Sequence, residues 1–160
     1  MRGGRINTDA NENSAGVNAS DLEVNIKIAL GTLVRAGEMD IENRNAFLVE
    51  MTDEVAGLCL KNNFLQSVAL SLAERNAADA LPDHRVLIEA LERDGHLDRG
   101  VEFLPDNAAL DDRHASGKGL SRPELAVLLA YAKNTLTSEL LASSVPDDPY
   151  LASELFRYFP

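Results

Sequence analysis

Apolar side chains in this 160-residue chain recur at intervals of three and four residues, which is the period of an amphipathic helix. Runs of strictly alternating apolar and polar residues, which indicate a half-buried strand, are missing. The pattern therefore predicts an all-α fold, an irregular bundle of about five to seven helices that follows an extended N-terminal segment.

The first helix is predicted to begin at Ser20 and to run to about Arg35, where Gly37 stops it. Ser20 is placed as the N-cap, with Glu23 three residues later, so that each side chain satisfies an otherwise unpaired amide at that end. The apolar stripe that this helix presents to a core consists of Leu22, Ile26, Leu30, Leu33 and Val34.

Later helices follow from the same period and from start and stop signals. The long segment after Thr52, where Asp53 and Glu54 supply a cap and negative charge, is expected as one bent helix or two abutting helices. A break in it is predicted at Asn62 and Asn63. The other predicted helices start near Asp40, run from Pro82 to before Gly95, run from the Ser121–Glu124 capping box to about Ala142, and close the chain from Tyr150 to Phe159.

Residues 96–120 carry few helix signals and are predicted to form a long connection. Such loops are uncommon in compact domains unless they are functional or are packed by their own side chains. The side chains expected to anchor this loop on the body of the protein are Val101, Phe103, Leu104 and Leu110.

Charge and composition narrow the functional classes. The 26 acidic against 15 basic residues give a net charge of -11, which repels phosphate backbones and argues against a nucleic acid partner. No apolar run approaches the roughly 20 residues that span a bilayer, and a signal peptide is missing, so a cytoplasmic location without membrane contact is expected. The single cysteine, Cys59, lies on an apolar helical pattern and is expected to be a small buried side chain.

Several motifs resemble chemical sites without meeting their requirements. Gly117-Lys118-Gly119 lacks the upstream Gly and the following Ser or Thr of a phosphate loop. The histidines are dispersed among polar residues without a metal-ligand spacing, which predicts surface positions and no metal site. The charged run 111–114 is expected to be solvated. The three histidines are His84, His96 and His114.

One stretch, NTDANENSAGVNASDLEVN at residues 7–25, is dense in Asn, Ser, Gly and Asp and runs directly into the first predicted helix. Two interpretations compete: a tail that ends at a helix cap, which is favoured for the isolated chain, or one wall of an active site whose remainder lies outside this chain. In the isolated chain, residues 1–18 are expected to be mobile because no neighbouring wall would hold them.

This stretch resembles the characteristic segment of the large bacterial NAD-specific glutamate dehydrogenases. EMTDEVAGLCLKNNFLQSVALSLAE and GLSRPELAVLLAYAK are similar to later segments of the same family, in the expected order. Asn13-Ser14-Ala15-Gly16-Val17, followed by Ser20 and Glu23, is similar to the N-A-G-G-V-x-x-S-x-x-E element of glutamate dehydrogenases, with Ser-Ala-Gly in place of Ala-Gly-Gly.

The resemblance implies NAD as the cofactor and L-glutamate as the substrate of a parent enzyme, which would belong to amino-acid catabolism. It places Asn13 beside the nicotinamide carboxamide and Ser20 on the side-chain carboxylate of the substrate. A helix N-terminus with a hydroxyl group suits an anion, and Gly16 permits close approach of a ligand to the backbone. Ser20 can cap a helix and still contact substrate, so the two roles are compatible.

The chain lacks the Gly-rich phosphate turn and the Lys and Asp that such a dehydrogenase needs, so we expect no catalytic residue here and no activity or NAD binding by the isolated chain. Residues 1–19 are expected to end the parent's catalytic domain, and residues 20–160 to form a helical domain that supports packing, regulation or homo-oligomerisation. The apolar ending ELFRYFP indicates a following segment and predicts self-association. The alternative is a free-standing all-α interaction or scaffold module.

Overall fold

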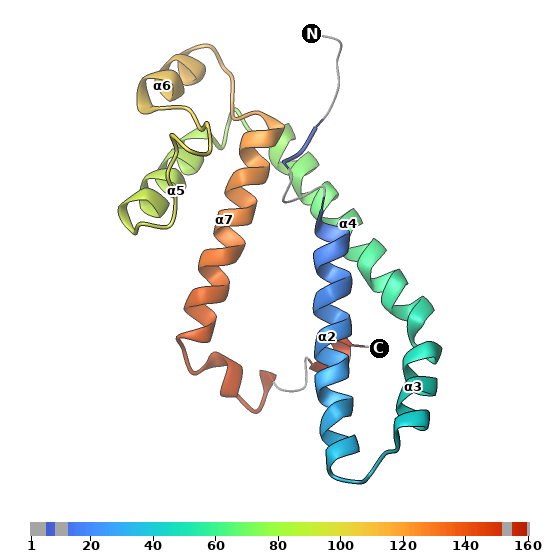
Figure 1. The fold of residues 1–160 in the computed structure, drawn as a ribbon. Helices are drawn as coiled ribbons and strands as arrows, with labels where there is room; N and C mark the ends of the chain where they lie inside the picture. The colour runs from blue at the N-terminus through green and yellow to red at the C-terminus, as the bar shows by residue number, and fades with distance from the viewer. Residues whose placement is uncertain (1–5, 9–12, 152–154, 160) are drawn as a thin grey trace. The chain divides into compact units, whose positions relative to one another are not determined.

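The computed structural model describes the chain except for residues 1–5, 9–12, 152–154 and 160. All regular elements among the described residues are helical, which confirms the predicted all-α class (Figure 1). In chain order they are α2 (Ser14–Arg35), α3 (Ile41–Glu50), α4 (Thr52–Arg75), α5 (Leu81–Arg93), α6 (Asn107–Ala115), α7 (Arg122–Leu141), the 3-10 helix η1 (Val145–Asp147) and α8 (Leu155–Tyr158).

Contacts within the chain define two compact units. The α2 unit comprises Asn13–Leu65 and Ser144–Pro160, and the α7 unit comprises Met1–Glu12 and Gln66–Ser143. The border between the units falls inside α4, so each unit contains part of that helix. The predicted boundary at residues 19 and 20 concerns the domains of a parent protein and stays a prediction.

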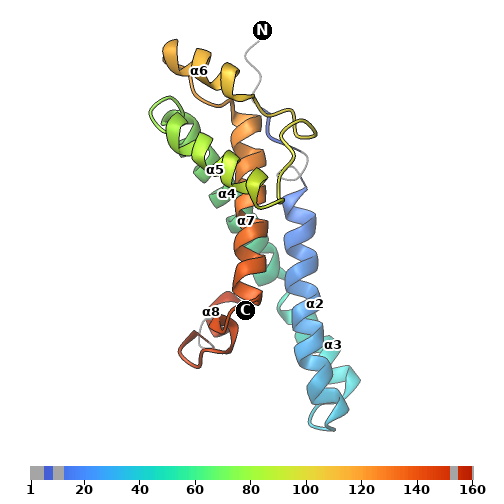
Figure 2. The same ribbon diagram turned by 90° about the vertical axis from the view of Figure 1, so that its left-hand side faces the viewer.

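In the α2 unit, α2 and α3 form a helical hairpin (Figures 1 and 2). Its turn passes through Gly37, whose φ of 74° lies in the left-handed region that Gly adopts without strain, and this confirms the predicted stop. Asp40 caps α3 by accepting a hydrogen bond from the Asn43 amide at 2.7 Å. The buried centre of the hairpin is formed by Ile26, Leu30 and Met51.

The start of α2 differs from the prediction. The helix begins at Ser14 instead of Ser20, so residues 14–19 are helical and not extended. Ser20 is therefore an exposed residue inside the helix, and Glu23 pairs with Lys27 one turn later instead of completing a capping box. The sequence between Ser14 and Ser20 contains no proline, so nothing in its covalent structure prevents an earlier start.

Helix α4 is continuous, so the predicted break at Asn62 and Asn63 is wrong. Both amide side chains find partners without interrupting the helix. Asn63 Nδ2 donates to the Cys59 carbonyl one turn earlier at 2.8 Å, and Asn62 Nδ2 donates to Asn18 Oδ1 on α2 at 3.0 Å. Cys59 is buried, as predicted.

The α7 unit is built around the first half of α7, where four consecutive side chains from Leu125 to Leu128 are buried. The predicted capping box is present at the start of this helix, where the Glu124 carboxylate accepts from the Ser121 amide at 2.6 Å. Residues from α4, α5 and α6 complete the core, namely Leu70, Leu81, Ile88, Leu91 and Leu110.

The predicted long connection contains a helix, α6, which the sequence analysis missed. Asp106 caps it by accepting from the Ala109 amide at 2.8 Å, and Leu110 is fully buried beneath it. The helix has only nine residues and one buried side chain, so its apolar periodicity is too short to be recognised in the sequence.

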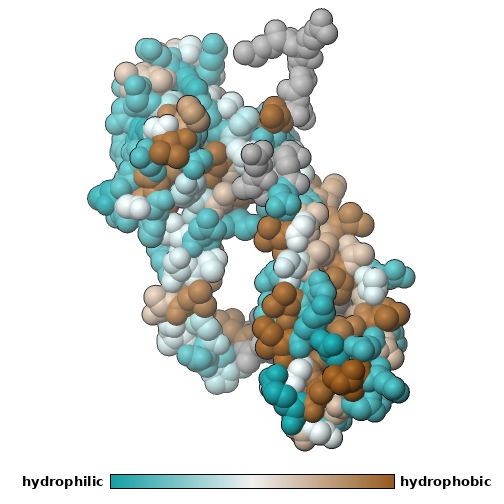
Figure 3. Space-filling model, in the orientation of Figure 1, coloured by the Kyte–Doolittle hydropathy of each residue, from teal (hydrophilic) through white to brown (hydrophobic). Residues whose placement is uncertain are grey.

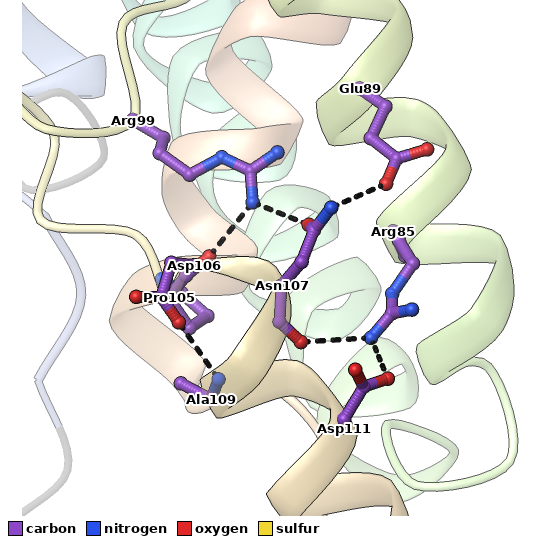
Figure 4. A network of polar contacts seen from close by, with 8 residues as sticks. All are labelled: Arg85, Glu89, Arg99, Pro105, Asp106, Asn107, Ala109 and Asp111. Atoms are coloured by element: carbon purple, nitrogen blue, oxygen red, sulfur yellow. Dashed lines mark hydrogen bonds and ion pairs between the residues drawn. The ribbon is translucent and has the colours of Figure 1, made fainter.

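Polar contacts attach α6 to α5 (Figure 4). Asn107 is at their centre: its side chain accepts from Arg99 at 2.9 Å and donates to Glu89 at 3.1 Å. Its carbonyl accepts from Arg85, which also pairs with Asp111. Two residues of the charged run 111–114 form ion pairs: Asp111 pairs with Arg85, and Arg113 pairs with Glu124.

The anchors of the 96–120 segment are only partly as predicted. Leu104 and Leu110 are buried, whereas Val101 and Phe103 are 66% and 89% exposed. Phe103 has a φ of 54°, and the segment turns there so that the Leu104 amide bonds to the Arg99 carbonyl at 2.9 Å. This turn buries Leu104 and leaves Phe103 outside.

The described part of the chain contains no helix long and apolar enough to span a membrane, and no cluster of His, Cys, Asp and Glu that could hold a metal ion. His96 and His114 are exposed, as predicted. His84 is half-buried, and its Nδ1 atom is enclosed without a hydrogen-bond partner among the described residues. Burial lowers the pKa of this imidazole.

The predicted closing helix is shorter than expected. Helix α8 covers Leu155–Tyr158, and part of the predicted range lies outside the described residues. In the α2 unit the Tyr158 hydroxyl donates to Asp21 at 3.2 Å, and Phe159 packs against the core that contains Ile26.

Candidate functional site

The three residues singled out in the sequence lie on one face of α2. Asn13, Gly16 and Ser20 are separated by three and four positions, the spacing that places side chains above one another on a helix. At about 100° per residue they point away from Leu22 and Ile26, which are buried. All three are exposed, so the structure brings them together on a surface open to a ligand.

Asn13 stands at the N-terminus of the helix without acting as a side-chain cap. Its carbonyl accepts from the Val17 amide at 3.3 Å, while its carboxamide makes no capping bond. A carboxamide offers both a donor and an acceptor, so this side chain can pair with another amide group.

Gly16 lies directly beneath that carboxamide. A Cβ atom added to Gly16 would be 3.0 Å from Asn13 Oδ1, closer than ordinary packing allows. Glycine therefore leaves room for the Asn13 side chain over the first turn, and a larger residue would require the carboxamide of Asn13 to shift.

Ser20 lies in the middle of the helix, so the predicted anion site cannot form there. The amides without an intrahelical partner belong to the first turn, residues 14–16. These amides and the positive end of the helix dipole are close to Asn13 and one and a half turns from Ser20. Any contact of Ser20 with a substrate must come from its hydroxyl alone.

Apolar side chains continue the same face along α2. Val17, Val24 and Ile28 are 62%, 48% and 60% exposed. In the space-filling view, hydrophobic side chains gather over the part formed by α2 and α3 (Figure 3). We call this face the outer stripe of α2; its residues are Asn13, Gly16, Val17, Ser20, Val24 and Ile28.

The apolar half of this stripe was not predicted from the sequence. Because the helix was predicted to start at Ser20, Val17 fell outside it and could not be aligned with Val24 and Ile28. Extending the 3.6-residue period back to Ser14 would have revealed the stripe.

The outer stripe can bind and orient a ligand, but it offers no acid or base of its own. Glu23 and Lys27, which flank it, pair with each other, and the hydrogen bond and charge of Lys27 lower the pKa of Glu23. The site is therefore one wall with an amide, a hydroxyl, a glycine and apolar side chains, and it supports recognition and not proton transfer.

Comparison with known proteins identifies the class of protein to which this wall belongs. Residues 1–73 match the family model described as bacterial NAD-glutamate dehydrogenase, catalytic domain. Residues 117–160 match the model described as glutamate dehydrogenase, C-terminal. The outer stripe of α2 lies in the match to the catalytic domain.

The chain belongs to the bacterial NAD-glutamate dehydrogenase family, which confirms the resemblance found in the sequence. It is similar to proteins named NAD-specific glutamate dehydrogenase from three bacteria. The identities are 48% over 160 residues for Pseudomonas aeruginosa, 46% over 160 for Mycobacterium tuberculosis and 44% over 159 for Halomonas elongata. The matches cover 99–100% of this chain and 10% of each relative.

Proposed function

We propose that this chain is part of a parent enzyme that oxidises L-glutamate with NAD. In that reaction glutamate, NAD⁺ and water give 2-oxoglutarate, ammonium, NADH and a proton. The names of the relatives support NAD as the cofactor, and the family membership supports the reaction class.

Within the parent, the outer stripe of α2 would form one wall of the active site. The observation that carries this proposal is the alignment of Asn13, Gly16 and Ser20 on the exposed face of α2, opposite its buried side chains. In this role Asn13 pairs with the carboxamide of the nicotinamide, and the Ser20 hydroxyl donates to the side-chain carboxylate of glutamate. NAD supplies the hydride acceptor, and these residues only bind and orient.

The carboxamide of Asn13 fits a role toward the nicotinamide because it does not cap its own helix. Gly16 fits because a side chain there would crowd the carboxamide of Asn13. Ser20 fits less directly, since it lies beyond the free amides of the first turn. We propose no catalytic acid or base in this chain and no turnover by the chain alone.

The helical remainder would pack against the catalytic part of a cytoplasmic, homo-oligomeric parent. The exposed Val17, Val24 and Ile28 support this role, because apolar side chains that adjoin a ligand-binding wall are normally covered by another part of the enzyme. We propose no nucleic acid or membrane partner, in keeping with the net charge of -11.

The test is NADH formation from glutamate by the full-length parent, unmodified and with Asn13→Ala or Ser20→Ala. Ser20→Ala should lower kcat/KM for glutamate by the equivalent of roughly 1 to 3 kcal/mol, the value of a hydrogen bond to a charged group. Asn13→Ala should weaken NAD binding more than glutamate binding.

Asn134→Ala is the matched control, because Asn134 is exposed on α7 and lies in the other unit. It should leave both kinetic constants unchanged. An inactive unmodified parent would refute the proposed reaction, whereas an active parent with normal Asn13 and Ser20 variants would refute only the proposed wall.

A further inference from the structure

A cleft lies between α5 and α6, and the residues that line it all belong to the α7 unit. Its volume is about 330 Å³, at the lower end of the range for small-molecule sites in proteins. Leu81 and Leu110, which are buried, form the floor of the cleft, and the exposed Pro82 and Val86 extend it. Most of the lining is therefore apolar and favours an apolar ligand body.

Arg85 supplies a positive charge to this cleft. Its Nη2 atom donates to the Asn107 carbonyl at 3.1 Å and also pairs with Asp111, so both hydrogens of that nitrogen are used (Figure 4). Nε and Nη1 have no hydrogen-bond partner among the described residues, which leaves three of the five N–H donors of the guanidinium for a ligand. The side chain is 30% exposed, so a ligand can reach these donors.

Asp111 neutralises Arg85, but it is a weak partner. The ion pair involves a single nitrogen of the guanidinium, and the Asp111 side chain is 69% exposed, so water screens the pair. A ligand carboxylate that replaces Asp111 can bind two nitrogens at once, in the bidentate geometry that arginine favours. Asp111 can then turn into solvent at little cost.

The remainder of the cleft suits only one negative charge. His114 lies at the exposed rim, where its imidazole can add one hydrogen bond. A second carboxylate or a phosphate dianion would place a charge over the apolar floor or beside Asp111, where nothing compensates it. The net charge of -11 disfavours a dianion further. The lining therefore matches one carboxylate joined to an apolar body.

We propose that the cleft between α5 and α6 binds a small monocarboxylate with an apolar body. The ligand carboxylate replaces Asp111 on Arg85, and the apolar body covers the floor. The lining residues fall within 81–114, whereas the two family models match residues 1–73 and 117–160, so neither domain description covers this site. The proposed oxidation of glutamate does not involve it.

The test is a titration of the full-length parent with 3-phenylpropanoate, followed by the NMR signals of the ligand. A dissociation constant on the order of 1 mM is expected for a ligand of this size. The amide 3-phenylpropanamide has the same shape without the charge. It should bind about tenfold more weakly, because it cannot form a charge-assisted pair with Arg85. Equal binding of acid and amide, or no binding of the acid, would overturn the proposal.

Arg85→Gln should weaken the binding of 3-phenylpropanoate about tenfold, because the charged partner of the carboxylate is lost. Arg93→Gln is the matched control. Arg93 lies on the same helix, its side chain is 72% exposed, and it does not line the cleft. Its variant should leave the dissociation constant unchanged. Equal losses in the two variants would contradict a specific role of Arg85.

Arg85→Gln also removes a contact with α6, so a second pair of variants leaves Arg85 in place. Val86→Glu adds a negative charge to the lining and should weaken binding of the acid several-fold. Val101→Glu is its control, because Val86 and Val101 are 65% and 66% exposed and Val101 does not line the cleft. Unchanged binding in Val86→Glu would refute the location of the site.

Asp111→Asn tests the chemical class of the ligand. It should tighten the binding of 3-phenylpropanoate by about threefold, because the group that competes for Arg85 loses its charge. Weaker binding in Asp111→Asn would mean that the cleft recognises a positive group through Asp111, and this would overturn the assignment of a carboxylate ligand.

Hydrogen exchange locates the bound probe without reference to activity. Exchange of the peptides that cover residues 81–93 and 107–115 should slow when 3-phenylpropanoate is added to the unmodified parent, and should not change in Arg85→Gln. Saturating L-glutamate should not displace the probe. Displacement would place the probe in the substrate site of the parent and overturn the proposal.

The two proposals can fail separately. A parent that binds 3-phenylpropanoate in this cleft but does not oxidise glutamate would refute the proposed reaction alone. A parent that oxidises glutamate but does not bind the probe would refute the cleft site alone.

Discussion

At the scale of single residues, Gly119 packs directly against the backbone of Ala77 in the α7 unit. A Cβ atom on Gly119 would lie 2.1 Å from the Ala77 carbonyl carbon and 2.2 Å from its oxygen. Both are backbone atoms, so a larger residue cannot be accommodated by a change of side-chain rotamer. Glycine is required here for close approach of two backbones, a reason that does not involve a phosphate loop.

Gly119→Ala should therefore destabilise the chain by about 1 to 3 kcal/mol, the usual range for overpacking. Urea unfolding measures the effect. Gly57→Ala is the control of opposite sign: Gly57 lies within α4 with nothing within 4 Å, and alanine should stabilise the helix by roughly 0.5 to 1 kcal/mol. A Gly119→Ala chain as stable as the unmodified one would contradict the packing.

The Glu124 carboxylate should make the stability of the chain depend on pH. Burial raises the pKa of Glu124, but hydrogen bonds from Arg113 and Ser121 lower it by a larger amount. The pKa of this carboxylate therefore lies below its ordinary value. The stabilisation is therefore complete above the unfolded pKa of about 4.3 and is lost as the pH falls through the folded pKa.

Glu124→Gln should cost roughly 1 to 3 kcal/mol at neutral pH, because the Arg113 contacts at 2.7 and 2.9 Å lose their charge assistance. The difference from the unmodified chain should shrink in unfolding curves recorded below about pH 4. As a control, Asp94→Asn, in an exposed pair with Arg93, should cost less than about 1 kcal/mol. A pH-independent difference would refute the assignment.

At the scale of elements, the local signals that were correct are backbone stops and caps. Gly37 and Gly95 end helices with φ of 74° and 75°, and Glu124 completes its capping box. These features depend on a few neighbouring atoms, so the sequence suffices to find them. Ser20 shows where such local signals fail, because a cap motif that lies inside a longer helix does not cap it.

The free energy of unfolding should distinguish Ser20, which lies inside α2, from Asp40, which caps α3. Ser20→Ala should leave the free energy of unfolding within about 0.5 kcal/mol or raise it, since alanine is the better helix former at an exposed interior position. Asp40→Ala should cost about 1 kcal/mol, because Asp40 caps α3. Circular dichroism during urea unfolding measures both. A loss at Ser20 equal to that at Asp40 would indicate a cap at Ser20 after all.

At the scale of the whole molecule, the exposed apolar side chains of the outer stripe predict self-association of the chain by itself. Sedimentation velocity should show association that increases with concentration. Val24→Ser with Ile28→Ser should reduce it, whereas Val101→Ser, at an exposed apolar position in the other unit, should reduce it less. A chain that stays monomeric at every concentration would contradict a buried role for the stripe.

The sequence by itself determined the all-α class, most helix positions, the family and the positions Asn13, Gly16 and Ser20 of the candidate wall, because these depend on local periodicity, on caps and on motif order. Only the tertiary structure decided that α2 begins at Ser14, that α6 forms within residues 96–120, that Gly119 packs on Ala77 and that Arg122 binds Asn7. The Gly119–Ala77 packing and the Arg122–Asn7 bond join atoms distant in the chain, and such interactions leave no local pattern to recognise. The period of α6 is too short to be recognised, and the cap motif at Ser20 concealed the earlier start of α2.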